Sequence, residues 1–278
     1  MCQLCHVKSS PWVARRGFLL AMGAAAAEPV LAQVDVGEAS RLRSLVPAQE
    51  LELAAAQQYT QLLQQARAKN ALAPESHAQV QRLRAIAGRL IPQAPRWNQR
   101  ASNWRWEVNL IGSQSINAFC MPGGKIAFFT GILDKLQLSD DEAAMVMGHE
   151  MAHALREHAR ARIAKSQATG VGLSIAAQLF GLGQLGDVAA NVGTQLLTLK
   201  FSRDDEIEAD LVGLELAARA GYNPDASVSL WEKMQRAAGG AGGPAFLSTH
   251  PAQPDRIRRL QENVPRVRGL YQQAVGRR

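Results

Sequence analysis

The sequence predicts an α+β fold that is mostly helical, with a small antiparallel sheet beside one central helix. Apolar residues recur at helical spacing over residues 47–69 and 74–91, so each stretch has one face to bury. Alternating side chains over residues 104–110 predict a strand. Residues 117–119 and 125–130 flank a Pro-Gly-Gly turn, which predicts a hairpin. The chain therefore supplies helices and three short strands for a single domain.

The central helix is predicted to begin after Ser139, because Ser-Asp-Asp-Glu reads as a capping box with acidic residues in the first turn. An apolar run leads from there into His149-Glu150-Met151-Ala152-His153, an H-E-x-x-H segment. Residues i and i+4 share one helix face, so His149 and His153 can bind one metal ion. Glu150 can take a proton from a water on that metal. The alternative is a helix that carries two unrelated histidines.

A zinc hydrolase requires a third protein ligand. The pattern H-E-x-x-H-x-x-G-x-x-H fails, because the chain has Arg156 for the glycine and Ala159 for the histidine. His158 misses that position by one residue and is predicted to be a solvated helix histidine. Glu206 and Asp210 lie four residues apart in a later helix, so Glu206 can bind the metal while Asp210 accepts a hydrogen bond from a ligand histidine. The alternative for this pair is a charged surface face.

Four blocks of sequence follow one another along the chain. They are Asn117-Ala118-Phe119-Cys120-Met121-Pro122-Gly123-Gly124-Lys125-Ile126, the H-E-x-x-H segment, Ser202-Arg203 through Glu206 to Asp210, and Thr249-His250-Pro251 with Arg256 six residues after the histidine. In this combination the chain resembles the M48 family of zinc metallopeptidases, which includes the CAAX prenyl proteases and the membrane protease HtpX. The four blocks span residues 117–260, about half of the chain.

The resemblance implies a zincin-type metallopeptidase domain of the gluzincin kind, which acts as an endopeptidase on polypeptide substrates. It implies one Zn²⁺ per chain, bound by His149, His153 and Glu206, with Glu150 as the catalytic base. In the mechanism that we expect, Glu150 takes a proton from water and later delivers it to the leaving amine.

The resemblance also assigns roles to the hairpin and to the late block. Asn117, Ala118 and Phe119 are implied to bind substrate, since an edge strand can pair with an extended peptide backbone; the alternative is a sheet that only packs against the core. His250 and Arg256 are implied to be catalytic, by stabilising the oxyanion or holding a product carboxylate. The alternative is a loop histidine and a structural ion pair.

Two classes of function are compatible with these residues. One is an endopeptidase that removes misfolded or damaged envelope proteins. The other is a latent zinc-binding chaperone or scaffold protein with an occluded site. Glu150 favours the endopeptidase, because a purely structural zinc site has no need of a base beside its first histidine.

Residues 1–32 read as an export signal. Arg15-Arg16-Gly17-Phe18-Leu19 matches the twin-arginine pattern, and Val30-Leu31-Ala32 is a small-residue cleavage site. The apolar run between them is too short to span about 30 Å of hydrocarbon as a helix. We therefore expect residues 33–278 to form the mature domain in the periplasm. The alternative is a disordered basic tail before an alanine-rich helix.

The cysteine pattern and the charge distribution argue against haem attachment, a disulfide-bonded scaffold and nucleic-acid binding. Cys2 and Cys5 precede His6 in a C-x-x-C-H haem-attachment pattern, but this pattern would be lost with the signal. Only Cys120 would remain, which excludes an intrachain disulfide in the mature chain. The formal net charge of +7 is concentrated in C-terminal arginines, which we interpret as a solvated helix face. No nucleic-acid partner is expected, since no aromatic interleaving or nucleic-acid motif accompanies them.

Two glycine-rich stretches complete the sequence. Residues 170–199 are apolar but interrupted by polar residues, so they predict an α-hairpin rather than a transmembrane span. A peripheral contact with a membrane and the oligomeric state both stay open. Residues 239–244 form either a flap over the site or a plain linker.

Overall fold

The computed structural model describes residues 34–168, 199–238, 244–251 and 255–277. The predicted signal over 1–32 lies outside the described residues. The predicted hairpin over 170–199 and the glycine-rich stretch over 239–244 also lie outside them, except for the last residue of each.

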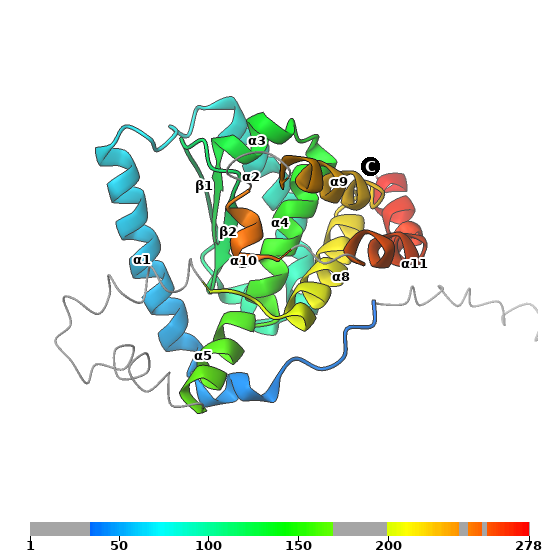
Figure 1. Ribbon diagram of the computed structural model, residues 1–278, viewed down its shortest axis with the longest axis horizontal. Helices are drawn as coiled ribbons and strands as arrows, with labels where there is room; N and C mark the ends of the chain where they lie inside the picture. The colour runs from blue at the N-terminus through cyan, green and yellow to red at the C-terminus, as the bar shows by residue number, and fades with distance from the viewer. Residues whose placement is uncertain (1–33, 169–198, 239–243, 252–254, 278) are drawn as a thin grey trace, which may run out of the picture. The chain divides into compact units, whose positions relative to one another are not determined.

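The described chain is mostly helical and contains one small sheet (Figure 1). Its first half comprises η1 (Arg41–Leu45), α1 (Ala48–Ala68), α2 (Ala78–Leu90), η2 (Ile91–Arg96), η3 (Gln99–Asn103), β1 (Glu107–Ile111), β2 (Ala118–Met121) and β3 (Lys125–Phe129). Its second half comprises α3 (Thr130–Leu136), α4 (Asp140–Leu155), α5 (His158–Ala168), α8 (Arg203–Arg219), α9 (Ala226–Ala238), α10 (Phe246–Thr249) and α11 (Arg256–Gly276). The helices predicted over 47–69 and 74–91 are confirmed as α1 and α2.

The sheet has the strand order β1-β3-β2 and is mixed, which corrects the expectation of an antiparallel sheet in one respect. The hairpin is antiparallel as predicted, with Cys120 opposite Ile126. However, β1 runs parallel to β3, with Val108 opposite Ile126. The reason is that residues 112–117 carry the chain from β1 to the far edge of the sheet. The hairpin then folds inward, so β3 takes the central position and runs in the direction of β1.

The hairpin turn depends on its two glycines. Gly123 and Gly124 have φ values of +82° and +79°, a region that side chains disfavour. A Cβ on Gly124 would also lie 2.7 Å from the ring of Trp106. Trp106 and Trp104 pack together just before β1, with ring centroids 5.3 Å apart. The strand predicted over residues 104–110 is found at Glu107–Ile111.

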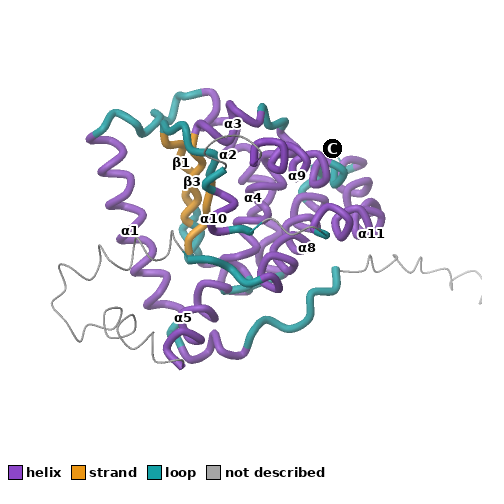
Figure 2. Tube along the Cα trace, in the orientation of Figure 1, coloured by secondary structure: helices purple, strands orange, loops and turns teal. Residues whose placement is uncertain are grey.

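The sheet lies between α1 on one side and α4 on the other, and α8 packs along the far side of α4 (Figures 1 and 2). The predicted capping box at the start of α4 is present, since Ser139 and Glu142 each accept a hydrogen bond from the other's backbone N–H. Ser202 and Asp205 form the same box at the start of α8. Both helices thus begin at defined residues, which fixes the position of each later side chain along the helix axis.

The close approach of α4 and α8 depends on two glycines that face each other. A Cβ on Gly148 would lie 2.8 Å from the carbonyl oxygen of Gly213, and a Cβ on Gly213 would lie 2.6 Å from the backbone nitrogen of His149. The two backbones are therefore in direct contact beside the first histidine of the H-E-x-x-H segment. This contact brings the acidic face of α8 to the histidine face of α4.

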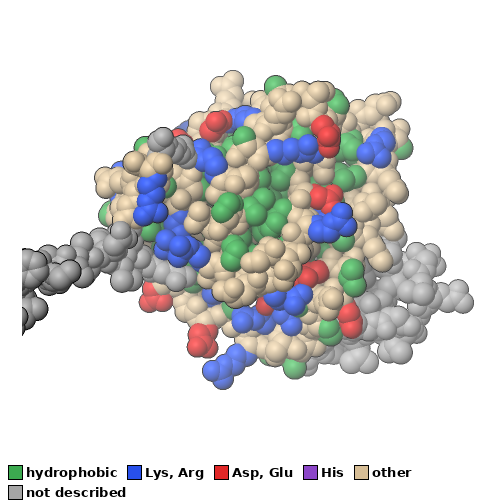
Figure 3. Space-filling view, turned by 180° about the vertical axis from the view of Figure 1, so that it is seen from behind, with side chains coloured by type: hydrophobic (Ala, Val, Ile, Leu, Met, Phe, Trp, Pro, Cys, Tyr) green, Lys and Arg blue, Asp and Glu red, His purple; other side chains and the backbone are tan. Residues whose placement is uncertain are grey.

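Two observations on the described residues concern contact with a membrane and the distribution of basic side chains. None of the helices described has the length and apolar character needed to cross a membrane. On the face that Figure 3 shows, lysine and arginine side chains are spread among acidic and apolar ones rather than gathered in one patch.

Candidate metal centre

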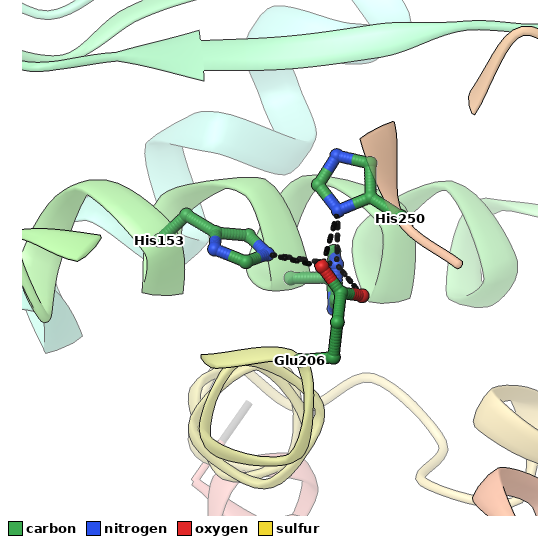
Figure 4. Close-up of side chains that lie close together, drawn as sticks. His153, Glu206 and His250 are labelled. Carbon is green, nitrogen blue, oxygen red and sulfur yellow. Dashed lines mark hydrogen bonds and ion pairs between the residues drawn. The ribbon is translucent and has the colours of Figure 1, made fainter. Parts of the chain in front are cut away.

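Four buried side chains from three parts of the chain converge at one point. His149 and His153 come from α4, Glu206 from the first turn of α8, and His250 from the residue that follows α10. One ligand atom from each lies within 4.8 Å of the others. Figure 4 shows His153, Glu206 and His250 directed toward this common point. The described chain therefore assembles a candidate metal centre of three imidazoles and one carboxylate.

The two α4 histidines face the centre through the same ring atom. Their Nε2 atoms lie 3.2 Å apart. Nε2 of His149 lies 3.6 Å from Oε2 of Glu206, and Nε2 of His153 lies 3.5 Å from Oε1. Burial lowers the pKa of His153 well below 6.5, as do the nearby His149 and His250. The neutral form that results is the one that binds metal.

Each of these histidines has a partner on its other ring nitrogen. Nδ1 of His149 lies 3.1 Å from Oδ1 of Asp210. Nδ1 of His153 lies 2.9 Å from Nδ1 of His158, whose Nε2 lies 3.3 Å from Oε2 of Glu208. Such contacts fix the tautomer and orientation of a metal-binding imidazole.

The prediction that His158 is solvated is wrong, since only 3% of its surface is exposed. Glu157 before it has a φ of +58°, so the chain breaks between α4 and α5. The ring of His158 then lies against His153, with centroids 5.0 Å apart. A continuous helix would have placed it differently.

Arg256 lies beside the metal centre and is only 3% exposed. Its Nη1 lies 2.9 Å from Oε2 of Glu206, and its Nε lies 2.5 Å from Oδ2 of Asp210. Its guanidinium carbon lies 3.4 Å above the ring of Trp231. The charge of Arg256 is thus matched by two carboxylates that themselves contact the histidines.

His250 lies between the two glutamates of the site. Its Nδ1 lies 2.9 Å from Oε1 of Glu206, and its Nε2 lies 3.4 Å from Oε1 of Glu150. Burial lowers the pKa of His250, but the charges of Glu150 and Glu206 outweigh this effect, so the pKa is raised above 6.5. The ring also stacks on Phe246, with centroids 4.4 Å apart.

Glu150 and Glu206 differ in their electrostatic environment although both are buried. Burial raises the pKa of Glu150 above 4.5, with partial compensation from His250 and His149, which suits a carboxylate that must accept a proton. Burial also raises the pKa of Glu206, but the hydrogen bond and charge of His250, with the charges of His149 and Arg256, lower it to about 2. Glu206 is therefore ionised, as a metal ligand must be.

The residues present fit a zinc ion. Oε1 of Glu150 is buried and accepts no hydrogen bond, and its contact with Nε2 of His250 is long, at 3.4 Å, so this oxygen can still accept a proton. Two imidazoles and one carboxylate form a common ligand set of catalytic zinc. The structure brings His149, His153 and Glu206 together in this set, with Glu150 beside them.

The hairpin predicted to bind substrate borders the same site. β2 is an edge strand and packs against α4. The backbone of Cys120 donates a hydrogen bond to Glu150. Ala118 is buried, whereas Asn117 and Phe119 are half-buried. The free edge of the sheet thus faces the candidate base.

The comparison with known proteins bears on this geometry. The model of peptidase family M48 matches residues 77–264. This range includes every residue of the centre and the edge strand.

The chain belongs to peptidase family M48.

Relatives within M48 include mitochondrial and bacterial proteins. The mitochondrial metalloendopeptidase OMA1 of Schizosaccharomyces pombe is 40% identical over 166 residues, which are 59% of this chain and 48% of that protein. The metalloprotease LoiP of Escherichia coli is 27% identical over 210 residues, 73% of this chain and 78% of LoiP. The β-barrel assembly-enhancing protease of E. coli is 29% identical over 178 residues, 59% of this chain and 36% of that protein. The chain therefore spans about half the length of the yeast OMA1 it matches.

Membership of M48 confirms the predicted fold class, a mostly helical metallopeptidase domain with a small sheet. The sequence alone did not point to His158, Glu208 or Trp231. His158 could have been found from its spacing of five residues after His153, which is compatible with contact if the helix breaks between them. Trp231 carries no signal of its own, because only the packing of α9 brings it over Arg256.

Proposed function

We propose that this M48 protein is a zinc-dependent endopeptidase in which His149, His153 and Glu206 hold the metal and Glu150 is the general base. The observation that carries the proposal is the buried Oε1 of Glu150, which accepts no hydrogen bond, contacts Nε2 of His250 only at 3.4 Å, and lies within the electrostatic reach of His149 and Glu206. A structural metal site has no use for such a carboxylate.

The residues around the metal have separate tasks in this proposal. A bound zinc ion supplies a Lewis acid that polarises the scissile carbonyl and makes water acidic enough to lose a proton near neutral pH. Glu150 takes that proton and passes it to the leaving amine. The free edge of β2 pairs with the extended substrate backbone. Asp210 and Arg256 hold the ligands in position, and His250, whose Nε2 lies 3.4 Å from Oε1 of Glu150, can donate a hydrogen bond to a developing oxyanion.

The proposed substrates are misfolded or damaged proteins of the cell envelope, reached after export through the twin-arginine signal over residues 1–32. Similarity to the β-barrel assembly-enhancing protease of E. coli supports this setting. Replacing Arg15 and Arg16 with lysine should leave uncleaved precursor in the cytoplasm. N-terminal sequencing of the periplasmic form should begin at Gln33; a form that begins near Met1 would refute cleavage.

A latent zinc-binding protein, either a chaperone or a scaffold, is the second candidate, and His250 favours it. Its Nδ1 lies 3.3 Å from Nε2 of His149, within the same group of donor atoms as the three ligands. Four protein ligands close a zinc site, whereas hydrolysis requires one open position. In this candidate His250 blocks the position that water needs.

One experiment separates the two candidates. Casein cleavage is compared among the purified mature wild type, Glu150→Gln and His250→Ala, with and without a chelator. The endopeptidase proposal expects wild-type cleavage that chelation and Glu150→Gln abolish, and lower cleavage by His250→Ala. Latency expects an inactive wild type and a gain of cleavage in His250→Ala. Zinc-loaded proteins that are all inactive would refute the endopeptidase.

A further inference from the structure

An apolar pocket adjoins the candidate base. Glu150 and His153 line it together with apolar side chains from α1, β2 and the segment before α8. The apolar residues that line it include Ala48, Leu51, Phe119, Met121, Leu199 and Phe201. We call this cavity the α1 pocket. It is bordered by the candidate reaction centre at one point and by the free edge strand at another.

The charged side chains that line the α1 pocket are already paired. Glu52 accepts hydrogen bonds from Arg100 at 2.8 Å and from Trp104 at 3.0 Å. Glu157 contacts Arg160 at 2.6 Å and Arg43 at 3.1 Å. Glu150 itself lies 3.4 Å from Nε2 of His250, so each carboxylate of the described lining already has a basic side chain beside it. A charged ligand group would lose water here without gaining a partner, which is unfavourable.

The α1 pocket lies where a substrate side chain would be placed if the peptide pairs with β2. A peptide that pairs with the edge of β2 is extended, so its alternate side chains point to opposite faces. Phe119, Cys120 and Met121 are consecutive on β2 and all line the pocket, so the pocket opens along the edge of this strand. A substrate residue next to Glu150 would therefore direct its side chain into this cavity.

We propose that the α1 pocket binds an uncharged, apolar side chain of the substrate next to the scissile bond. This inference rests on the proposed endopeptidase function and adds a preference to it. The preferred substrates are apolar segments that a folded protein buries.

The test uses quenched fluorescent peptides that differ at one residue on either side of the cleaved bond. With the wild type, kcat/KM should be at least about tenfold higher for leucine or phenylalanine than for alanine, aspartate or lysine at one of these positions. Ala48→Trp fills the pocket and should reverse the order in favour of alanine. Gln49→Trp is the matched control, because Gln49 is the exposed neighbour on the same helix and does not line the pocket.

Binding is measured alongside cleavage, so that the two proposals fail separately. Fluorescence anisotropy with zinc-loaded Glu150→Gln should show the same preference for leucine or phenylalanine, which Ala48→Trp removes in the double variant. If binding shows this preference but the wild type cleaves nothing, the endopeptidase proposal fails and the pocket stands. If neither binding nor cleavage depends on the residue, or if both tryptophan variants behave alike, the α1 pocket is not the binding site.

Discussion

Nδ1 of His153 lies 2.9 Å from Nδ1 of His158, at the point where α4 gives way to α5. When Nε2 of His153 faces the metal, its Nδ1 carries the hydrogen and donates a hydrogen bond to Nδ1 of His158. His158 then carries its own proton on Nε2, which faces Glu208. The chain of contacts therefore sets the tautomers of both histidines.

Replacing His158 should weaken zinc binding without unfolding the protein. Loss of a hydrogen-bond partner of a metal-binding histidine costs about 10- to 100-fold in metal affinity, and we expect this loss for His158→Leu. His158→Asn keeps an acceptor near the position of Nδ1 and should recover much of the affinity. Competition with a chromophoric chelator measures both. Equal affinities for the two variants would show that packing, and not the hydrogen bond, is what matters.

Gly213→Ala should separate α4 from α8. The added Cβ would lie 2.6 Å from the backbone nitrogen of His149, so the helices must move and displace Glu206. Overpacking of this kind costs about 1–3 kcal/mol, and zinc affinity should fall with it. Gly88→Ala is the control, because a Cβ there meets nothing within 4 Å. It should stabilise α2 by up to about 1 kcal/mol. Thermal unfolding of both variants provides the comparison.

Arg256→Ala should lower both stability and zinc affinity. The change leaves the carboxylates of Glu206 and Asp210 buried without their cation, and breaking a buried pair costs about 3–5 kcal/mol. Arg258→Ala is the control on the same helix. Its exposed pair with Glu262 should change stability by less than about 1 kcal/mol. If Arg256→Ala instead keeps its Tm and its zinc but loses kcat, Arg256 acts on the reacting atoms.

Glu142 should make the protein sensitive to acid. Burial raises the pKa of this carboxyl group. Hydrogen bonds from the side chains of Lys233 and Ser229 and from the backbone of Ser139 outweigh the effect of burial, so the pKa lies below 4.5. A folded-state pKa below the unfolded one stabilises the fold above pH 4.5, and this stabilisation is lost as the pH falls through the folded-state pKa. The difference in unfolding free energy between wild type and Glu142→Gln should therefore be constant near neutral pH and shrink below pH 4.5. Urea titrations at several pH values test this; a constant difference down to pH 3 would contradict it.

Local patterns in the sequence were sufficient wherever the geometry belongs to one element. The spacing of His149 and His153 requires only a helix, and the capping box at Ser139 confirms where that helix begins. The Pro-Gly-Gly turn likewise predicted the hairpin, because a two-stranded turn depends on the residues within it. The fold class and the resemblance to M48 could be read from such blocks.

The tertiary structure decided everything that depends on how separate elements meet. The direction of β1 follows from the inward fold of the hairpin, which no residue of β1 encodes. The contact of His158 with His153 requires the break at Glu157. His250 follows His149 by 101 residues in the sequence, and its place among the ligands requires α10 to pack beside α4. The physical reason is that a helix fixes distances over one or two turns. The metal centre instead depends on the backbone contact of α4 with α8, which only the packed fold establishes.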